Sequence, residues 1–376
     1  MNKIYLNRRL TLDPVTSHLL LGPRRTGKST LLRHVEKNSR VIDLLKSDVF
    51  YAYRMRPSLL REQLIGTSET VVIDEVQLIP DLLREVHWLI ENTSNRFILC
   101  GSSARKLRRE GVTNLAGRLH SSFLLPLTQQ ELPEFRIERY LQIGGLPPIW
   151  FASDPETALR DYCGEYLKEE IQAEGAVRKL ASFTRFLEVC AASNGELIAP
   201  TTIGRDVGVS GKTVSEYFQI LVDTLLGFYL EPFTKVRKRR AIQTPKFYWF
   251  DCGVPQALLG RTLAEKTPEF GRAFEHFMIL ETRAAMLYDR SLSQMKYWRS
   301  ASGYEVDLVI DESTAVEFKS GAVHDGDSRG LLALSEELRL KNLWIVGLSG
   351  SERQLSNGVR YLPWLTYLEC LRRGPL

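Results

Sequence analysis

The chain has 376 residues, of which 44% are hydrophobic and 25% are charged, which is the composition of an ordinary globular protein. This length allows two or three packed domains, because single cores rarely grow beyond about 250–300 residues. The formal net charge of +5 is too mild to establish a nucleic-acid partner by itself.

Cysteine usage and hydropathy exclude two further classes of protein. The five cysteines are odd in number, lie far apart and form no CxxC pair, which argues against a disulfide framework or a zinc knuckle. We expect reduced, mostly buried thiols. The N-terminal segment lacks the apolar core of a signal peptide, and no run of about 18 apolar residues occurs. The expectation is a soluble, cytoplasmic protein without a membrane partner.

Residues 17 to about 125 alternate short apolar runs with amphipathic segments. Apolar runs at 17–22, 40–45, 70–76 and 96–103 predict strands, and the segment from Lys28 predicts a helix. Short strands that are apolar on both faces, with helices between them, indicate a parallel sheet covered on both sides. The sequence therefore predicts an α/β fold for residues 1–130.

A phosphate-binding motif follows the first apolar run. Residues 22–29, GPRRTGKS, match the pattern G-x-x-x-x-G-K-[ST] in full, between a predicted strand and a predicted helix. The glycines let the backbone wrap phosphates, while main-chain N–H groups, the helix N-terminus and Lys28 supply positive potential. Ser29 is expected to hold magnesium. The residues predicted to bind ATP are Gly22, Pro23, Arg24, Arg25, Thr26, Gly27, Lys28, Ser29, Thr30, Asp74 and Ser102.

Polar residues end two other predicted strands of this sheet. In TVVIDEVQ, Asp74 is the expected magnesium ligand and Glu75 the residue that polarises the attacking water. An acidic pair after a strand can also cap a helix, although a full phosphate-binding motif favours the catalytic interpretation. Ser102 or Ser103, at the end of the strand over 96–103, would sense the γ-phosphate in the crevice of the sheet. The alternative is that either serine caps the next helix.

Later segments change character. Residues 131–194 read as helical, broken by GGLPP at 144–148, and we interpret them as a lid or linker. From about Glu269 a long helix precedes three strands at 296–300, 304–310 and 314–320, then a helix over 328–340 and a strand over 342–347. This order predicts a second α/β domain.

Residues 201–230 predict a helix-turn-helix, with a first helix over 202–207, a turn at Gly208 and a second helix from about Gly211. Its predicted core comprises Ile203, Val207, Val209, Val214, Phe218 and Leu221. Lys212 and Thr213 would then face outward toward DNA. A basic run follows where a winged helix places its wing, and such a run binds phosphates independently of sequence: Lys235, Arg237, Lys238, Arg239 and Arg240. The alternatives are a solvated face and a protein-contact module.

Carboxylates recur in the predicted C-terminal strands. Alternation places Glu305 and Asp307 on one face of the strand over 304–310, and Glu317 shares a face with Lys319 in the next strand. Charged residues on inner strands are costly unless they are paired or bound to a metal. The alternative to a metal site is an Asp307–Lys319 salt bridge in a catalytically silent scaffold.

The phosphate-binding loop, the DEVQ element, the GSS strand end and the stretch GRLHSSFLLPLT resemble the AAA+ ATPases. More closely, the chain resembles a bacterial and archaeal group that joins such a core to a winged helix and a C-terminal restriction-endonuclease-like, PD-(D/E)xK domain. The resemblance covers essentially the whole chain. It implies a core over 1–130, a lid over 131–194, a winged helix over 195–255 and a nuclease-like domain over 256–376.

The resemblance also implies ligands and partners. ATP and Mg2+ would bind the core, and the chain would form a homo-oligomeric ring in which an arginine reaches the neighbour's γ-phosphate. Arg118 is the candidate, and the alternative is a surface or intramolecular salt bridge. In endonuclease-like folds Asp307 and Glu317 would bind a divalent metal, magnesium or manganese, with help from Glu275, while Lys319 would orient or activate water.

Three functional hypotheses follow. The first is an oligomeric ATPase that couples hydrolysis to DNA binding and movement or remodelling, with Glu75, Lys28 and Arg118 as its catalytic residues. The second is an ATP-gated, metal-dependent nuclease or a signalling or defence switch. The third is a non-enzymatic, nucleotide-dependent DNA-binding regulator, which would tolerate Glu75→Gln.

Overall fold

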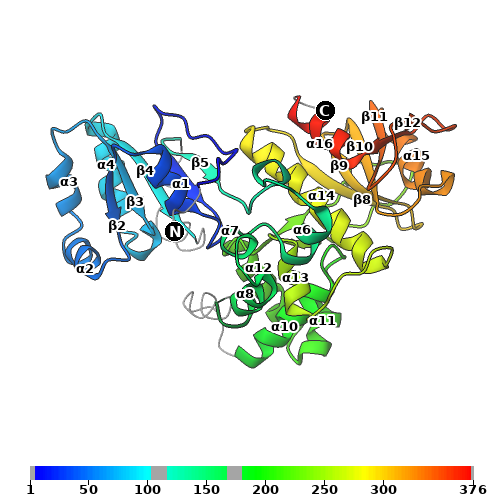
Figure 1. The fold of residues 1–376 in the computed structure, drawn as a ribbon, viewed down its shortest axis with the longest axis horizontal. Coiled ribbons are helices and arrows are strands. Elements are labelled where there is room, and N and C mark those ends of the chain that lie inside the picture. Colours follow the sequence, from blue (N-terminus) through cyan, green and yellow to red (C-terminus); the bar gives the residue numbers. More distant parts are fainter. Residues whose placement is uncertain (1–4, 103–116, 167–179, 374–376) are drawn as a thin grey trace. The chain divides into compact units, whose positions relative to one another are not determined.

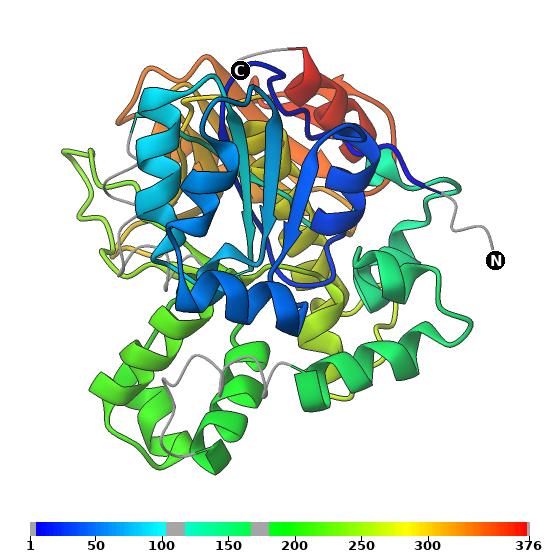
Figure 2. The ribbon, with the colours of Figure 1, turned by 90° about the vertical axis from the view of Figure 1, so that its left-hand side faces the viewer.

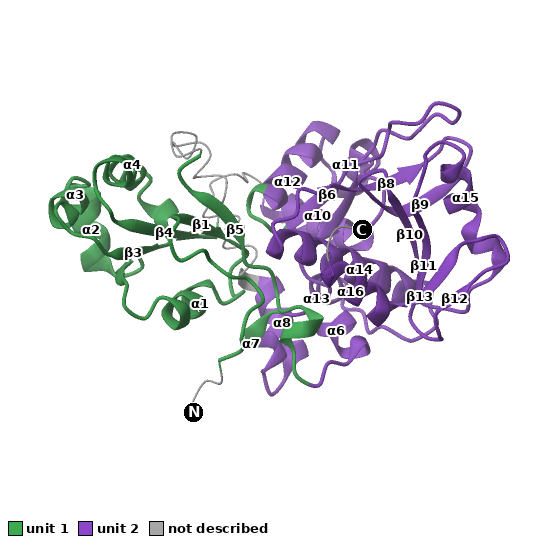
Figure 3. Cartoon of the chain, turned by 90° about the horizontal axis from the view of Figure 1, so that it is seen from above, with its two compact units in different colours: residues 1–133, 146–148, 223–226 green, residues 134–145, 149–222, 227–376 purple. Residues whose placement is uncertain are grey.

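The computed structural model describes residues 5–102, 117–166 and 180–373, with the elements labelled in Figure 1. The chain divides into two units, coloured separately in Figure 3. The first comprises residues 1–133 with the short segments 146–148 and 223–226. The second comprises residues 134–145, 149–222 and 227–376. Each unit has its own sheet.

A five-stranded parallel sheet organises the first unit. Its strands are β1 (His18–Leu21), β2 (Arg40–Asp43), β3 (Thr70–Asp74), β4 (Arg96–Gly101) and β5 (His120–Phe123). Their order across the sheet is β2-β3-β4-β1-β5, and every neighbouring pair is parallel. Figure 2 shows these strands side by side in blue and cyan. All their carboxyl ends therefore lie along one edge, with β4 between β1 and β3.

Helices cover both faces of this sheet. They are α1 (Lys28–Val35), α2 (Ser47–Met55), α3 (Leu59–Leu64) and α4 (Leu82–Asn92), with short 3-10 turns η1 (Val76–Leu78) and η3 (Gln129–Glu131). Alternate strand residues such as Ile73 and Leu99 pack in one core with leucines of α3 and α4. The intervening Leu20, Val72 and Ile98 are also buried, and α1 lies on that opposite side (Figure 3). The predicted α/β fold is confirmed.

The second unit begins with helices. These are α6 (Ile137–Ile143), α8 (Pro155–Asp161) with a π-helical turn η4 (Tyr162–Tyr166), α10 (Leu180–Ala192), α11 (Pro200–Val207), α12 (Gly211–Asp223) and α13 (Gly253–Leu258). The GGLPP segment interrupts them as predicted, because Gly144 ends α6 with φ 73° and α7 (Pro147–Trp150) starts at a proline. An antiparallel pair of strands, β6 (Gly227–Leu230) and β7 (Lys246–Trp249), follows α12.

A mixed six-stranded sheet forms the rest of the second unit. Its order is β12-β13-β11-β10-β9-β8, and only the contacts of β11 with β10 and β13 are parallel. The strands are β8 (Met295–Arg299), β9 (Glu305–Ile310), β10 (Thr314–Lys319), β11 (Asn342–Gly347), β12 (Arg353–Gln354) and β13 (Arg360–Pro363). The helices around them are α14 (Pro268–Tyr288), the 3-10 turn η5 (Asp325–Ser328), α15 (Arg329–Ser335) and α16 (Trp364–Arg372). The predicted second α/β domain is therefore present, although α15 is shorter than the helix predicted over 328–340.

Two expectations about composition can be compared with the structure. All five cysteines are free, and only Cys370 is not fully buried. Within residues 5–102, 117–166 and 180–373, no helix is long and apolar enough to cross a membrane.

Candidate nucleotide site

The loop between β1 and α1 has the geometry of a phosphate cradle. Gly27 adopts φ 95°, a left-handed conformation that favours glycine. A Cβ on Gly22 would lie 2.3 Å from the carbonyl oxygen of Leu124, so only glycine fits there. Thr26 is buried and its Oγ1 donates to Pro23 O at 2.9 Å. Both motif glycines are thus required by the backbone path itself.

Lys28 is directed into the loop that it follows. Its Nζ donates to the carbonyl oxygens of Gly22 and Pro23 at 2.8 and 3.0 Å, and only 6% of the residue is exposed. Ser29 beside it is partly buried, whereas Arg25 and Thr30 are exposed. The ammonium therefore sits where phosphate oxygens would be cradled, and the donor set suits a polyphosphate.

The acidic pair lies at the neighbouring strand ends, as the sheet order requires. Asp74 ends β3, is 8% exposed, and its Oδ1 accepts a hydrogen bond from the Glu75 N–H at 3.1 Å. Glu75 adopts φ 57°, a left-handed conformation that is unusual outside glycine, and its side chain does not cap η1. Strain of this kind concentrates at functional sites.

Ser102 joins the phosphate-binding loop to the acidic pair. Its Oγ accepts from Arg24 Nε at 3.3 Å and donates to Glu75 Oε2 at 3.4 Å. Register places this residue directly after β4, the strand between β1 and β3. Ser103, the alternative sensor, lies outside the described residues. This position agrees with the prediction that Ser102 contacts the γ-phosphate.

Two residues that the sequence interpretation did not single out complete this site. Gln77 is buried, and its Nε2 donates to Glu75 Oε2 and, at 3.3 Å, to Ser102 Oγ. Arg8 donates from Nη1 to Thr26 O at 2.7 Å and from Nε to Glu131 Oε1 at 3.0 Å. Gln77 stands in the DEVQ string and could have been noticed, whereas nothing near Arg8 in the sequence marks its role.

Arg118, the predicted trans-acting arginine, makes an ion pair with Glu91 at the end of α4. The two side chains are 37% and 49% exposed, and the pair lies within one chain. The intramolecular salt bridge that the sequence left as an alternative is therefore present. Solvent screens an exposed pair of this kind, so its contribution to stability is small.

The helix-turn-helix prediction agrees with α11 and α12, which are separated by a turn in which Gly208 has φ 76°. Five predicted core residues are buried and Val209 is partly buried. Ser210 Oγ accepts from the N–H of Thr213 at 3.1 Å, so it caps α12, and Lys212 is exposed. The main-chain N–H of Thr213 is therefore already engaged by Ser210 within the same segment.

The predicted basic run lies in the connection between β6 and β7. Lys235 pairs with Glu312, and Arg239 Nη2 lies 2.7 Å from Glu336 Oε2. The main-chain N–H groups of Arg237 and Lys238 donate to Glu337 Oε2. Arg237, Lys238 and Arg240 have exposed side chains. The run is thus held against the C-terminal sheet by its backbone, and four of its five cations are exposed, Lys235 among them.

The C-terminal carboxylates line one cavity of about 240 Å³. Among the described residues, however, no three His, Cys, Asp or Glu side chains form a metal-binding group. Lys319 Nζ pairs with Glu317 Oε1 at 2.9 Å and with Asp327 Oδ1 at 3.7 Å, rather than with Asp307 as the alternative had it. Asp307 Oδ2 instead accepts from Phe318 N at 2.8 Å. The metal site expected from Glu275, Asp307 and Glu317 is not assembled in this form.

Burial and mutual repulsion act on these carboxyl groups. Burial raises the pKa of Glu317 to about 7, against the opposing effect of Lys319. Burial, with the charges of Glu317 and Glu275, raises the pKa of Asp307 well above its usual value. Lys246 lies among them, and although burial opposes it, Glu275 and its acidic neighbours raise the pKa of that ammonium well above its ordinary value. The cavity thus holds a buried cation that no sequence motif indicated.

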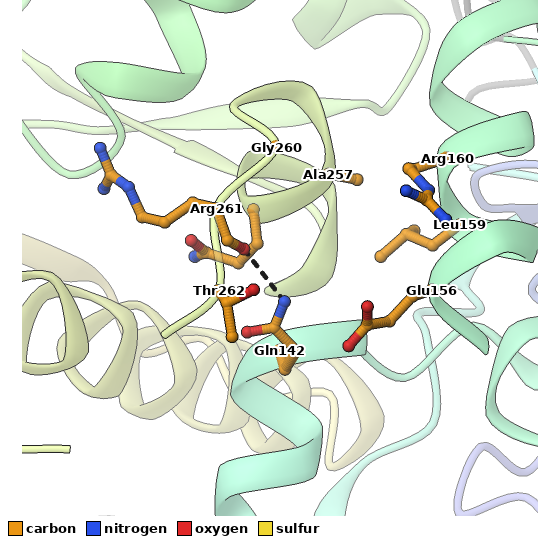
Figure 4. A pocket seen from close by; sticks show the side chains of 9 residues that line it. Gln142, Glu156, Leu159, Arg160, Ala257, Gly260, Arg261 and Thr262 are labelled. Carbon is orange, nitrogen blue, oxygen red and sulfur yellow. Dashed lines mark hydrogen bonds between the residues drawn. The ribbon is translucent and has the colours of Figure 1, made fainter. Parts of the chain in front are cut away.

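A smaller cavity of about 110 Å³ lies between α6, α8 and the segment after α13 (Figure 4). Its lining includes Glu156, Arg160 and Gln142, and Figure 4 shows the Gln142 amide directed toward Arg261. Gln142 Nε2 donates to Arg261 O at 3.0 Å, and its Oε1 accepts from Leu263 N at 2.9 Å. This glutamine therefore ties α6 to residues 261–263.

The fold and the loop define the first unit as a P-loop domain of the AAA type, and comparison with known families agrees. A model described as "AAA domain" matches residues 16–133. Two models described as "Domain of unknown function", DUF8612 and DUF4143, match residues 134–265 and 270–367.

Whole-chain relatives extend this assignment. An uncharacterized protein of Mycobacterium tuberculosis and one of Mycobacterium bovis are each 32% identical over 317 residues, which is 82% of this chain and 70% of theirs. The chain belongs to the family of these two proteins. A solved structure of the Aeropyrum pernix Orc1 protein in complex with DNA is 13% identical and covers 65% of this chain and 86% of its own, with a TM-score of 0.26. A score that low carries no inference about this chain.

Proposed function

We propose that the protein is an oligomeric AAA+ ATPase that couples ATP hydrolysis to DNA binding and to movement or remodelling of DNA. The observation that carries the ATPase part is the line of contacts along one sheet edge, from the phosphate-binding loop through Ser102 to Glu75. The adjacency of β1, β4 and β3 supports this proposal, because these three strands end at the loop over 22–29, at Ser102 and at Glu75.

Different residues of the first unit would bind the phosphates, the magnesium ion and the attacking water. The N–H groups of residues 22–29 and Lys28 would bind the phosphates of ATP, the substrate. Magnesium, held by Ser29 with Asp74 nearby, would supply positive charge at the phosphates. Glu75 would orient and polarise a water molecule in line with the terminal phosphorus, and Ser102 would contact the γ-phosphate. ADP and inorganic phosphate would be released.

The DNA part of the proposal is supported by α11, α12 and the basic connection. Lys212 on α12 and the exposed Arg237, Lys238 and Arg240 belong to the second unit and carry charge that phosphates attract. The paired Lys235 and Arg239 would contribute less, because each already has a carboxylate partner. The proposal also includes a homo-oligomer. In it, Arg118 would leave Glu91 and contact the nucleotide bound to a neighbouring subunit.

The test of the ATPase is Glu75→Gln, which keeps the shape of the side chain but removes its charge. We expect phosphate release to fall by a factor of a hundred or more while ATP binding persists, so that ATP remains trapped on the protein. The measurement is phosphate release with magnesium, alone and with duplex, single-stranded and branched DNA, together with the mass of the assembly with and without nucleotide.

Glu138→Gln is the matched control, because Glu138 is an exposed glutamate on α6. Wild-type turnover in Glu75→Gln would contradict the role of Glu75. No phosphate release from the wild type, with DNA binding intact, would favour the non-enzymatic regulator. A DNA-insensitive rate, or a monomer under every condition, would contradict the DNA or oligomeric part and leave the ATPase standing.

A further inference from the structure

The acidic cavity of the second unit contains a buried lysine delivered by a neighbouring strand pair. Lys246 is the first residue of β7, and only 4% of it is exposed. Its Nζ lies 2.8 Å from Glu305 Oε1 and 3.5 Å from Glu275 Oε1. Pairing with Leu230 of β6 fixes its main chain. An ammonium is thus held rigidly between carboxylates that belong to α14 and β9.

The other cations around the cavity differ from this one in their exposure. Arg299 Nη1 lies 3.6 Å from Glu305 Oε2, and the Arg299 side chain is 39% exposed. Arg272 pairs with Glu269, and its side chain is 43% exposed. Only 5% of the Lys246 side chain is exposed. Water screens the two arginines, whereas the charge of Lys246 acts on the carboxylates at nearly full strength.

One oxygen of each carboxylate expected to bind a metal already has another partner. Glu275 Oε1 accepts from the Tyr248 hydroxyl at 2.6 Å, and Asp307 Oδ2 accepts from Phe318 N. Glu317 Oε1 pairs with Lys319, and its Oε2 is buried without a hydrogen-bond partner among the described residues. A divalent ion bound through the partnered oxygens would have to displace these donors, and an ion bound through the remaining oxygens would still lie close to a fixed ammonium, which repels it. The donor set therefore does not fit a metal while Lys246 is charged and in place.

We propose that the Lys246 ammonium is the resident cation of this cavity and takes the place of a divalent metal, so that the C-terminal α/β domain is a metal-free scaffold. Buried carboxylates require a counter-charge, and here the chain supplies it from β7. This assignment concerns residues of the second unit alone and does not depend on ATP hydrolysis.

Manganese binding to the nucleotide-free full-length chain tests the proposal. Free Mn2+ is counted by electron paramagnetic resonance for the wild type, Glu317→Gln, Lys246→Met and the double variant Lys246→Met/Glu317→Gln. We expect wild type and Glu317→Gln to bind Mn2+ equally. Lys246→Met should gain one equivalent that binds at least tenfold tighter than any in the wild type, and the double variant should lose it. Lys341→Met, an exposed lysine elsewhere, is the matched control and should gain none.

Two results would overturn the proposal. One is a wild-type Mn2+ equivalent that disappears in Glu317→Gln, since this would show a native metal site. The other is a folded Lys246→Met protein, judged by circular dichroism, that gains no Mn2+. Should Lys246→Met fail to fold, the comparison of wild type with Glu317→Gln decides alone: equal binding supports the resident ammonium and unequal binding refutes it.

Discussion

Gln77 is the side chain on which the geometry of Glu75 depends most directly. It bridges Glu75 Oε2 and Ser102 Oγ, and its own Oε1 is buried without a hydrogen-bond partner in the described part of the chain. A buried amide with one unsatisfied oxygen is costly, which suggests that its position serves the site rather than stability. We infer that Gln77 is a positioning residue.

Gln77→Ala should lower kcat for ATP by about tenfold or more, because a carboxylate misplaced by about an ångström loses much of its effect on a bound water. The KM for ATP should change little, since the phosphate cradle is intact. Steady-state phosphate release measures both constants, and Gln354→Ala, on exposed β12, is the control. A kcat equal to that of the wild type would remove Gln77 from the mechanism.

Asp251 is a fully buried carboxylate that joins two glycine segments. Its Oδ2 accepts from Gly145 N at 2.8 Å and its Oδ1 from Gly253 N at 2.9 Å. Burial raises its pKa to about 6 despite these hydrogen bonds. Its two contacts with main-chain N–H groups are those of a residue that caps a turn. Its titration nevertheless makes stability depend on pH.

The sign of that dependence follows from the raised pKa. Between pH ~4 and ~6 the folded chain holds the Asp251 proton more tightly than the unfolded chain, so this group adds stability as pH falls, by at most about 3 kcal/mol. Above pH ~6 the contribution is absent. Urea unfolding of wild type and Asp251→Asn from pH 4 to 7 should therefore show a difference in unfolding free energy that widens toward pH 4. Buried His276, whose pKa burial lowers to about 4, acts in the opposite direction but equally in both proteins.

At the scale of elements, Gln142 links α6 to the segment after α13. Gln142 makes two hydrogen bonds to main-chain atoms of Arg261 and Leu263. Gln142→Ala should lower the unfolding free energy by roughly 1–3 kcal/mol, the sum of two typical hydrogen bonds. Gln142→Glu, which keeps the acceptor and loses the donor, should fall between. Chemical denaturation measures the loss, with Glu138→Ala, at an exposed position of α6, as the control. No loss in Gln142→Ala would mean that water replaces both contacts.

The loop between β1 and α1 illustrates an element that the sequence specifies almost completely. Its glycines, lysine and serine act through their own backbone and their immediate neighbours, so a fixed spacing encodes the geometry. The order of the strands across the sheet is not encoded by such a local spacing. That β4 separates β1 from β3 follows from packing over the whole unit, although the small polar residues after each strand indicated which ends would meet.

At the scale of the whole molecule, the exposed cations between β6 and β7 should govern DNA affinity if they contact phosphates. Replacing Arg237, Lys238 and Arg240 together by alanine should weaken binding to all sequences alike. The slope of log K against log salt should become shallower by about 2–3, because each phosphate contact contributes roughly 0.9. Fluorescence anisotropy at several salt concentrations measures this slope. The matched control replaces three exposed cations elsewhere, Lys37, Arg339 and Lys341. An unchanged slope would exclude the connection between β6 and β7 as a DNA contact.

Long-range contacts explain why part of the candidate sites could not be predicted. Arg8 and Glu131 are 123 positions apart, and Gln142 and Arg261 are 119 positions apart. No local pattern encodes such pairs. Lys246 is similar: it opens the aromatic strand KFYW, but nothing local in the sequence pairs it with Glu275 or Glu305, and the resemblance assigns Glu275 to a metal. The class of fold was predictable from periodicity, and the identity of the buried cation was not.

The connection from β6 to β7 also covers an otherwise open edge of the C-terminal sheet. β8 is the outermost strand, and its Tyr297 exchanges main-chain hydrogen bonds with Glu231 and Phe233, while Arg299 accepts one from Ile242. An uncovered outer strand is a template on which another copy of a protein can add a strand and begin to aggregate. By occupying those amides and carbonyls, the same segment that carries the basic run protects the chain from self-association through β8, so shortening it to study charge would risk insoluble protein.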